Sequence, residues 1–515
     1  MQKIIRSHWP WLLVSTAYAT FVIFLLCIGL NQAVWSDDVA SLSLGTWDWQ
    51  RFWTIINIDY HPPGYFLLLR AWLYCLSPLT TIFTPISQAK LLSFIPNLIL
   101  SLTGGWLLAK RRHYLSALIF ALAALSAPYI LPYAFEIRMY SLVMLTVTLA
   151  AYGAWRLLTG DQSIAAWLAL IGGSVATFWC QYFAGVPVFF IWLLLLSWAV
   201  WQKNFPLCRR LLAAGTFTLV LISPSLSLCY QQSHRLTNHP LATASIPLPD
   251  DYWWHFPASL VYPLGATPSV TAAAFGFNLT NLTLLLIAAV SWWFFTPQPY
   301  SRLVLAIGLI WLLSYLTGII LYTLGVPFIP RYLFPVSGLI WFAWSLIFAS
   351  DIRPISLSRR LTLAALALGT LILFAVNTTR FVRIKLAVAR DTTAYTNWRQ
   401  SALDADAQTV GIFDVGSLCI LENFRFAHQF QNFNCTSFRE ANLTPQLQTA
   451  LDADHAAYVI NYRVPCDKLP QFFPGWQLTP VFHASPDNPQ CQDSGITCPY
   501  NLVTPQCIYR ISPNN

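Results

Sequence analysis

Two adjacent carboxylates, Asp37 and Asp38, follow the first long apolar segment of the chain, residues 11–30. Ionisable side chains beside a hydrocarbon layer are rare unless they face a cavity or a partner, so they indicate a functional site. A second polar cluster, Asp59–Gly64 (DYHPPG), lies in the same connection, before the next apolar segment. Because a carboxylate can act as a general base, the sequence predicts a chemical site here, with His61 among its candidate residues.

Two further polar groups stand at the start of later apolar segments. Glu136, Arg138 and Tyr140 open one of them, and Arg331 with Tyr332 opens another. Guanidinium groups are always charged and match phosphate oxygens, so they can stabilise charge on a departing phosphate. Together with the carboxylates, these residues favour a reaction in which an acceptor hydroxyl loses a proton and a phosphate leaves.

Each of these side chains also has a purely structural explanation. Asp37 or Asp38 could cap a helix or pair with Arg51. Arg138 could pair with Glu136 or contact lipid headgroups, and Arg331 could also contact headgroups. His61 could form a hydrogen bond within its own loop.

The composition is that of a multi-pass membrane protein. Of the 515 residues, 56% are hydrophobic and only 10% are charged. A helix needs about 20 apolar residues to cross a membrane, and about eleven windows near that length occur. They are residues 11–30, 87–109, 114–131, 140–157, 164–181, 184–201, 211–230, 271–295, 303–325, 333–350 and 361–377. The sequence therefore predicts an all-α polytopic body.

Lysine and arginine collect in alternate connections, as they do in the cytoplasmic loops of membrane proteins. These residues are Lys3, Arg6, Lys110, Arg111, Arg112, Arg156, Lys203, Arg209, Arg210, Arg302, Arg353, Arg359 and Arg360. We therefore expect a plasma (inner) membrane protein with a cytoplasmic N-terminus, an uncleaved first helix, and the Asp37 connection and the tail outside. The net charge of +9 is explained by loops that face anionic lipid, and no nucleic-acid motif accompanies it.

The connection between the first two spans is too apolar for a plain loop. Residues 48–53 and 65–74 are rich in Trp and Tyr, which favour the membrane interface. We expect them to form interfacial helices that cover the acid pair. A second aromatic and acidic patch, residues 250–255, fits an interfacial anchor better than a substrate contact.

Residues 378–515 form a second unit, after a membrane body of residues 1–377. Apolar runs at 409–413 and 457–460 alternate with polar connectors, which predicts a small α/β domain outside the membrane. An even number of cysteines favours disulfides in an oxidising compartment, with the pairing left open. These cysteines are Cys419, Cys435, Cys466, Cys491, Cys498 and Cys507. They lack the spacing of a zinc site, so no metal is predicted there.

The order of these motifs resembles that of the C-type (GT-C) membrane glycosyltransferases. The motifs are the acid pair, His-Pro-Pro-Gly-Tyr from His61, Glu-x-Arg-Met-Tyr from Glu136, and Arg-Tyr-Leu-Phe-Pro from Arg331. The resemblance spans the membrane body. It is strongest to the branch that contains protein O-mannosyltransferases, lipid A aminoarabinose transferases and bacterial lipopolysaccharide-core glycosyltransferases.

This resemblance implies inverting transfer of a sugar from a polyprenyl-phosphate donor to a glycan, lipid or protein acceptor of the cell envelope. Asp37 would be the base and Asp38 would orient it or the acceptor, although the family's pair is commonly Asp-Glu, which leaves either carboxylate open as the base. Arg138, Tyr140 and Arg331 would hold the lipid phosphate, with His61, Glu136 and Tyr332 as further substrate-binding residues. No cofactor is implied, and a divalent metal stays open.

Two other functions compete with this hypothesis. A transporter or lipid flippase would place charged groups and broken helices near the membrane midplane, whereas these acids and arginines stand at outer helix ends. A non-enzymatic anchor for the C-terminal domain would give the motifs around Asp37, His61 and Arg138 no role.

Overall fold

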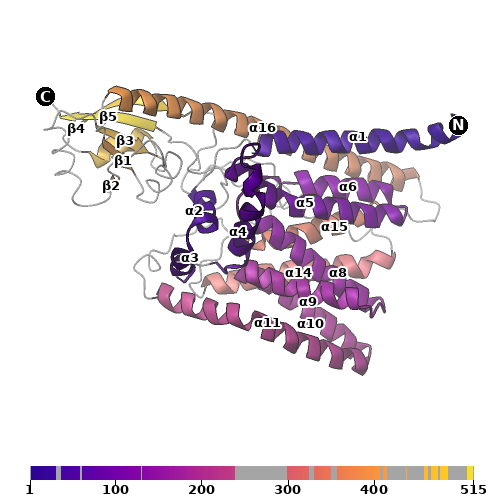
Figure 1. Cartoon of the computed structure of the whole chain (residues 1–515). Coiled ribbons are helices and arrows are strands. Elements are labelled where there is room, and N and C mark those ends of the chain that lie inside the picture. The colour runs from indigo at the N-terminus through magenta and orange to yellow at the C-terminus, as the bar shows by residue number, and fades with distance from the viewer. Residues whose placement is uncertain are drawn as a thin grey trace.

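The chain forms a bundle of long helices with a small β-sheet at one end (Figure 1). The computed structural model describes residues 2–30, 36–57, 59, 61–128, 130–237, 298–323, 330–349, 357–405, 410–413, 436–437, 457–461, 466–473, 476–484 and 507–513. Side chains of residues 2–13 and of a few further helical positions, Arg331 among them, lie outside this description.

The predicted all-α polytopic body is confirmed. Its helices are α1 (Gln2–Leu30), α5 (Pro85–Lys110), α6 (Tyr114–Ser126), α7 (Ile130–Tyr133), α8 (Tyr140–Leu158), α9 (Ile164–Cys180), α10 (Gly185–Trp201), α11 (Phe205–Thr237), α14 (Gln298–Thr323), α15 (Ser337–Leu346) and α16 (Leu357–Ala405), with the 3-10 helices η2 (Tyr182–Ala184) and η3 (Pro330–Val336). Within the described residues, 6 helices are long and apolar enough to cross a membrane, and four shorter apolar helices accompany them. The predicted span 271–295 and the patch at 250–255 lie outside the described residues.

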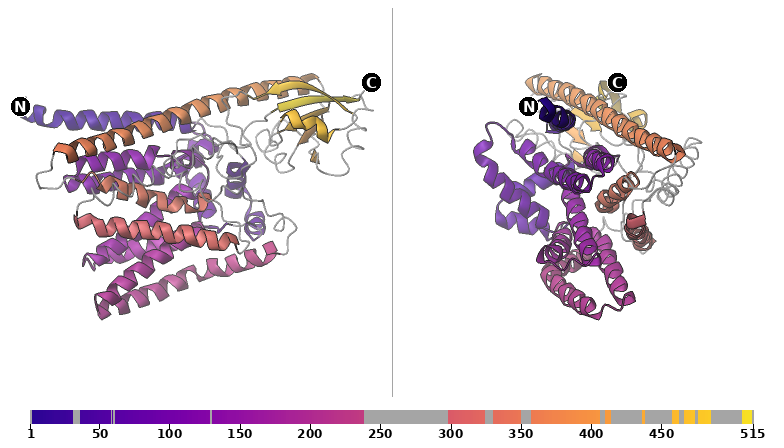
Figure 2. Two further views of the ribbon diagram at one scale, coloured as in Figure 1. Left: turned by 180° about the vertical axis from the view of Figure 1, so that it is seen from behind. Right: turned by 90° about the vertical axis from the view of Figure 1, so that its right-hand side faces the viewer.

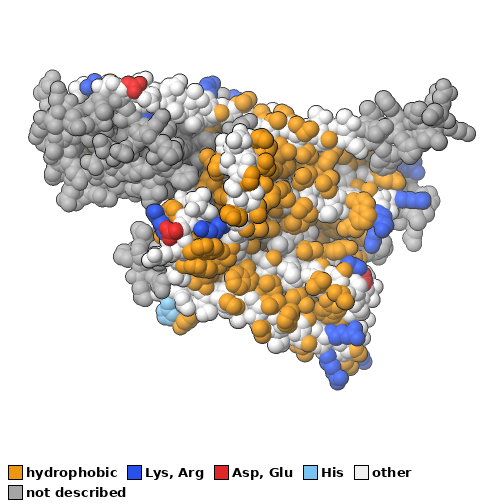
Figure 3. Space-filling view, in the orientation of Figure 1, with side chains coloured by type: hydrophobic (Ala, Val, Ile, Leu, Met, Phe, Trp, Pro, Cys, Tyr) orange, Lys and Arg blue, Asp and Glu red, His pale blue; other side chains and the backbone are white. Residues whose placement is uncertain are grey.

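Basic side chains gather at the end of the bundle that lies away from the sheet. Lys110 ends α5, Arg111 and Arg112 follow it before α6, and Lys203 lies between α10 and α11. Figure 3 shows Lys and Arg at this end and a broad hydrophobic surface along the bundle. We call this end, defined by those four residues, the basic end. A bundle with such an apolar flank is a multi-pass membrane protein.

Three short helices follow α1 at the other end, where the sequence predicted interfacial helices. They are α2 (Ser36–Thr46), α3 (Trp49–Ile56) and α4 (Gly64–Leu76), which is followed by the 3-10 helix η1 (Ser77–Leu79). Asp48 caps α3 by accepting a 2.9 Å hydrogen bond from the backbone N–H of Arg51. Phe52 and Ile56 are buried on one face of α3, while Trp53 on the other face is exposed. In Figure 1, α4 runs crosswise to the long helices.

Helix α4 begins against the end of α9. A Cβ atom added at Gly64 would overlap the carbonyl oxygen and carbonyl carbon of Trp179. Only a residue without a side chain permits this approach of two backbones. The contact fixes the segment before α4 against the segment that follows α9.

We expect Gly64→Ala to lower the free energy of unfolding by about 1–3 kcal/mol, because the backbone of Trp179 cannot rotate away as a side chain would. The measurement is the thermal unfolding midpoint in detergent. Gly172→Ala is the control: Gly172 lies inside α9 with open space around it, and alanine there favours the helix. A Gly64→Ala midpoint equal to that of Gly172→Ala would contradict the close contact.

The C-terminal domain is a five-stranded mixed sheet in the order β2-β1-β3-β5-β4. Its elements are β1 (Val410–Phe413), β2 (Thr436–Ser437), β3 (Ala457–Asn461), the 3-10 helix η4 (Cys466–Phe472), β4 (Trp476–His483) and β5 (Cys507–Pro513). The pairs β1–β2 and β1–β3 are parallel, whereas β3–β5 and β4–β5 are antiparallel. Val459, Leu469, Phe473 and Ile511 form its core.

One disulfide, Cys466–Cys507, ties η4 to β5. The predicted use of tail cysteines in disulfides is therefore confirmed for this pair. The other cysteines of the tail, Cys419, Cys435, Cys491 and Cys498, lie outside the described residues.

Helix α16 links the bundle to the sheet as one 49-residue helix. It passes without a break through Asn377, the residue at which the sequence places the domain boundary. Asn377 Nδ2 donates a buried 2.9 Å hydrogen bond to the carbonyl of Ser126, which fixes α16 to the bundle. Further along, Trp398 packs on Tyr458 of β3 at a ring distance of 5.1 Å. Figure 2 shows α16 running along the bundle and on to the sheet.

Candidate functional site

The acid pair lies in the first turn of α2, where the helix dipole favours negative charge. Asp38 is buried, and its Oδ1 accepts a 2.7 Å hydrogen bond from the backbone N–H of Ile137. Asp37 is more accessible, with 27% of its side chain exposed, and its Oδ2 accepts a 2.8 Å hydrogen bond from Arg138 Nη2. The fold thus joins residues about a hundred positions apart into one cluster, and leaves Asp37 as its accessible carboxylate.

Arg138 stands on a tightly packed segment between α7 and α8. Its backbone N–H donates a 2.7 Å hydrogen bond to the carbonyl of Glu136, and both side chains are buried. Phe135, just before them, stacks on Phe94 of α5 at 4.7 Å and on Phe381 of α16 at 6.4 Å. A buried guanidinium requires a partner, and the ion pair with Asp37 supplies one.

Two lysines that the sequence analysis did not select complete this cluster. Lys90 of α5 is fully buried, and Lys385 of α16 is close enough to Lys90, Glu136 and Asp38 to interact with them electrostatically. Three basic side chains, Lys90, Arg138 and Lys385, therefore accompany three carboxylates in one place. A lysine inside an apolar segment is a signal that could have identified Lys90, because such residues are rare without a function.

Tyr140 forms an aromatic cluster at the start of α8. It is fully buried, and its ring lies 5.0 Å from that of Tyr133 and 6.0 Å from that of Phe334 in η3. This contact brings the segment of Arg331 and Tyr332 to the same end of the bundle. Tyr332 is half-buried and stacks on Phe183 at 4.4 Å; the side chain of Arg331 lies outside the described residues.

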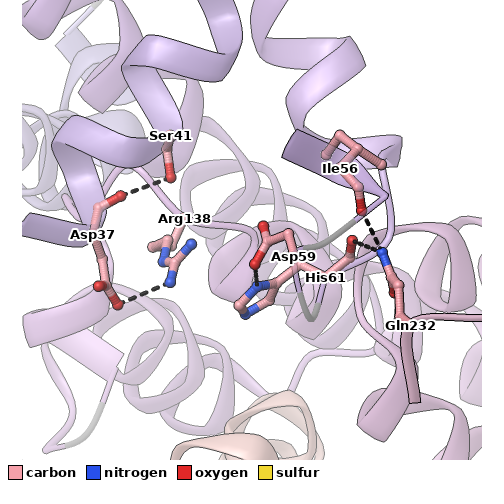
Figure 4. Close-up of polar contacts among 7 residues, drawn as sticks. All are labelled: Asp37, Ser41, Ile56, Asp59, His61, Arg138 and Gln232. Atoms are coloured by element: carbon pink, nitrogen blue, oxygen red, sulfur yellow. Dashed lines mark hydrogen bonds and ion pairs between the residues drawn. The ribbon is translucent and has the colours of Figure 1, made fainter. Parts of the chain in front are cut away.

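His61 and Asp59 form a second polar pair, in which His61 Nδ1 lies 3.3 Å from Asp59 Oδ1. Gln232, near the end of α11, fixes their loop: its Nε2 donates to the carbonyl of Ile56 at 2.6 Å and to that of His61 at 3.5 Å. Figure 4 shows Asp59 and His61 lying between the Asp37–Arg138 pair and Gln232. The two predicted polar clusters of the first connection therefore lie in the same region.

Tyr65 lies beneath the cluster. Its hydroxyl is 3.1 Å from that of Ser93 on α5, and burial raises the pKa of the phenol far above its usual value. Tyr65 therefore stays protonated at neutral pH, and it can only bind or orient the nearby Asp38 and Arg138.

Together these residues place the partly exposed carboxylate of Asp37 beside several basic side chains. A guanidinium beside a carboxylate favours its ionised form, which is the form that can act as a general base. Cations around it can neutralise a phosphate. Among the described residues, no three His, Cys, Asp or Glu side chains are grouped to hold a metal ion.

Comparisons with known proteins give only distant matches. No protein-family model and no curated protein sequence matches the chain. A crystal structure of ArnT from Cupriavidus metallidurans bound to undecaprenyl phosphate aligns over 97% of this chain and 98% of that chain, with 12% identity and a TM-score of 0.49. The apo structure of the same protein aligns over 98% of both chains, with 12% identity and a TM-score of 0.41. An identity of 12% shows a likeness of fold and assigns no function to this chain.

Proposed function

We propose that this chain is a GT-C-type membrane glycosyltransferase that moves a sugar from a polyprenyl-phosphate donor to an extracytoplasmic hydroxyl, with inversion at the anomeric carbon. The observation that carries the proposal is the pair formed by the accessible carboxylate of Asp37 and the buried guanidinium of Arg138, at 2.8 Å. The motif resemblance of the membrane body is independent support, because it rests on the order of residues and not on their contacts.

In the proposed reaction, Asp37 accepts the proton of the acceptor hydroxyl as its oxygen attacks the anomeric carbon. The bond between that carbon and the phosphate oxygen breaks, and polyprenyl phosphate leaves with the electron pair. Asp38 is less suited to be the base, because it is buried and already accepts the N–H of Ile137. Its role is to hold the start of α2 against the Arg138 segment.

The leaving phosphate gains negative charge, which cations can stabilise if they are in place before the reaction. Arg138 and Lys385 are the described basic side chains near Asp37 and Asp38. Tyr140 and Arg331 are the further residues proposed to hold the phosphate, and His61, Glu136 and Tyr332 are proposed as other substrate contacts. Because Lys and Arg favour the cytoplasmic face, the basic end would face the cytoplasm, and this site would face the outer side of the inner membrane.

The proposal is tested with purified protein and a panel of radiolabelled polyprenyl-phosphate sugars. We expect wild-type protein to release free polyprenyl phosphate from at least one donor, which would also name the sugar. If folded wild-type protein releases it from no donor, the transferase function is wrong, and a flux assay for lipid transport becomes the next experiment.

A further inference from the structure

Gln181 is a buried amide that the proposed chemistry does not use. Its residue is 2% exposed, and within the described part of the chain neither its Oε1 nor its Nε2 has a hydrogen-bond partner. It directly follows α9, in an extended backbone conformation. Buried polar groups in folded proteins almost always have a partner, so an amide left without one on both sides indicates a binding partner from outside the chain.

The residues on either side of Gln181 lie near the candidate site. Cys180, before it, is close enough to Tyr65 to interact electrostatically, and Tyr182, after it, is similarly close to Asp59. The same segment touches the start of α4, through Trp179 and Gly64. Gln181 therefore lies beside the loop that carries His61.

Gln232 borders the same loop from α11. It is 3% exposed, and its Nε2 is used by the carbonyls of Ile56 and His61. Its Oε1 has no hydrogen-bond partner among the described residues. The Tyr182 hydroxyl lies near Ser225, which is on the same face of α11, two turns before Gln232. The loop is thus flanked by two buried amides that both have unused hydrogen-bonding atoms.

The chemistry of these groups differs from that of the cationic cluster around Arg138. Amides are neutral and offer both a donor and an acceptor, which suits hydroxyl groups, whereas a phosphate is matched by cations. An aromatic surface lies next to Gln181, because Phe183 stacks on Tyr332 at 4.4 Å. Small-molecule sites commonly combine such apolar surface with a few placed polar groups.

We propose that Gln181 and Gln232 form a subsite that binds the hydroxyl groups of a sugar, with the Phe183–Tyr332 pair beside it. The proposal rests on the proposed glycosyltransferase function and deepens it, because it assigns neutral residues to the sugar and leaves the cations to the phosphate. The bound sugar is either the one carried by the donor or one in the acceptor. A donor sugar would make every reaction of the donor depend on Gln181, whereas an acceptor sugar would make only transfer to the acceptor depend on it.

The test uses Gln181→Met, which keeps the length of the side chain and removes its hydrogen bonds. For the polyprenyl-phosphate sugar that wild-type protein uses best, we expect kcat/KM to fall about tenfold. Two reactions are compared: release to water with donor alone, and transfer to a lipid extract of the cell envelope. A fall in both reactions assigns the donor sugar, and a fall in transfer alone assigns the acceptor sugar.

A second measurement distinguishes binding from a structural role. Because the Gln181 amide has no hydrogen-bond partner among the residues that the structure describes, Gln181→Met is expected to leave the unfolding midpoint unchanged or to raise it. Gln88 is the matched control: it is equally buried, but its amide donates to the carbonyls of Leu76 and Phe83, so Gln88→Met should lower the midpoint. Gln202→Met, at the basic end, should change neither quantity.

The hydroxyl itself is identified with deoxy analogues of the donor sugar. For wild-type protein, kcat/KM should be about tenfold lower for the analogue that lacks the bound hydroxyl than for the full donor sugar. For Gln181→Met, kcat/KM should be the same for this analogue and for the full sugar, because the hydrogen bond is already absent. Unchanged kcat/KM in Gln181→Met for both reactions, with active wild-type protein, would overturn the subsite and leave the transferase function standing. Absence of release by wild-type protein from every donor would overturn both.

Discussion

Asp37→Asn protein is expected to release polyprenyl phosphate about 10³-fold more slowly than wild-type protein, because loss of a general base typically costs 10²–10⁴ in rate. Asparagine keeps the shape of the side chain and an oxygen that Arg138 Nη2 can donate to. It cannot take the proton of an acceptor hydroxyl. The fall should appear in kcat, and the abundance of the protein in the membrane should stay near the wild-type value. The unfolding midpoint should fall, because the buried Arg138 loses its charged partner.

The matched control for this experiment is Asp38→Asn. Asp38 accepts the N–H of Ile137 through Oδ1, and an asparagine oxygen can accept the same hydrogen bond. We therefore expect Asp38→Asn to keep far more activity than Asp37→Asn. The reverse order would make Asp38 the base, and near-normal release by both variants would remove the acid pair from the mechanism.

Arg138→Ala is expected to lower kcat/KM for the lipid donor by about 10²-fold or more, the usual cost of losing one preorganised group that stabilises developing charge. The guanidinium also orients Asp37, so kcat should fall as well as the apparent affinity for donor. Removing one partner of a buried pair leaves the other uncompensated, so we expect a loss of about 3 kcal/mol in the free energy of unfolding. Arg138→Lys keeps the charge and should restore part of the activity.

Arg156→Ala provides the comparison for this variant. Arg156 pairs with Asp161 near the basic end, but both side chains are partly exposed, at 28% and 36%. Exposed pairs contribute about 0–1 kcal/mol, so turnover and stability should change little. If Arg138→Ala behaved like Arg156→Ala, neither the phosphate contact nor the orientation of Asp37 could be assigned to Arg138.

The sequence predicts the parts of the site that stand out by their position along the chain. Asp37 and Arg138 are visible because each is a charge at the edge of an apolar segment, and the alternation of spans places both at the same end of the bundle. The ion pair between Asp37 and Arg138 cannot be predicted from the sequence, because it depends on how α2 packs against the segment before α8. Gln181 carries no sequence signal, because the role proposed for it rests on burial without a hydrogen-bond partner in the described part of the chain.

The extent of α16 shows a second limit of sequence reasoning. Apolar residues end near Asn377, and a change of composition suggests a domain boundary there. The helix continues to Ala405 because its later turns bury selected side chains, such as Phe381 against Phe135 and Tyr395 against Phe482. Lys385 belongs by its position to the predicted second unit, residues 378–515. Because α16 continues beyond Asn377, Lys385 nevertheless lies near Asp38 at the candidate site of the membrane body. Strands β1 and β3 coincide with the apolar runs at 409–413 and 457–460, whereas the pairing of β3 with β5 joins segments that lie far apart in the sequence.

A continuous helix also fixes a length. Lys385, at the charged cluster, and Trp398, against the sheet, are separated by about 20 Å along the axis of α16, at 1.5 Å for each residue. Because no loop interrupts α16 between them, the sheet cannot approach the cluster by bending at a joint. Helix α16 is therefore a rigid connection, which holds the contact between Trp398 and the sheet at a constant axial distance of about 20 Å from Lys385.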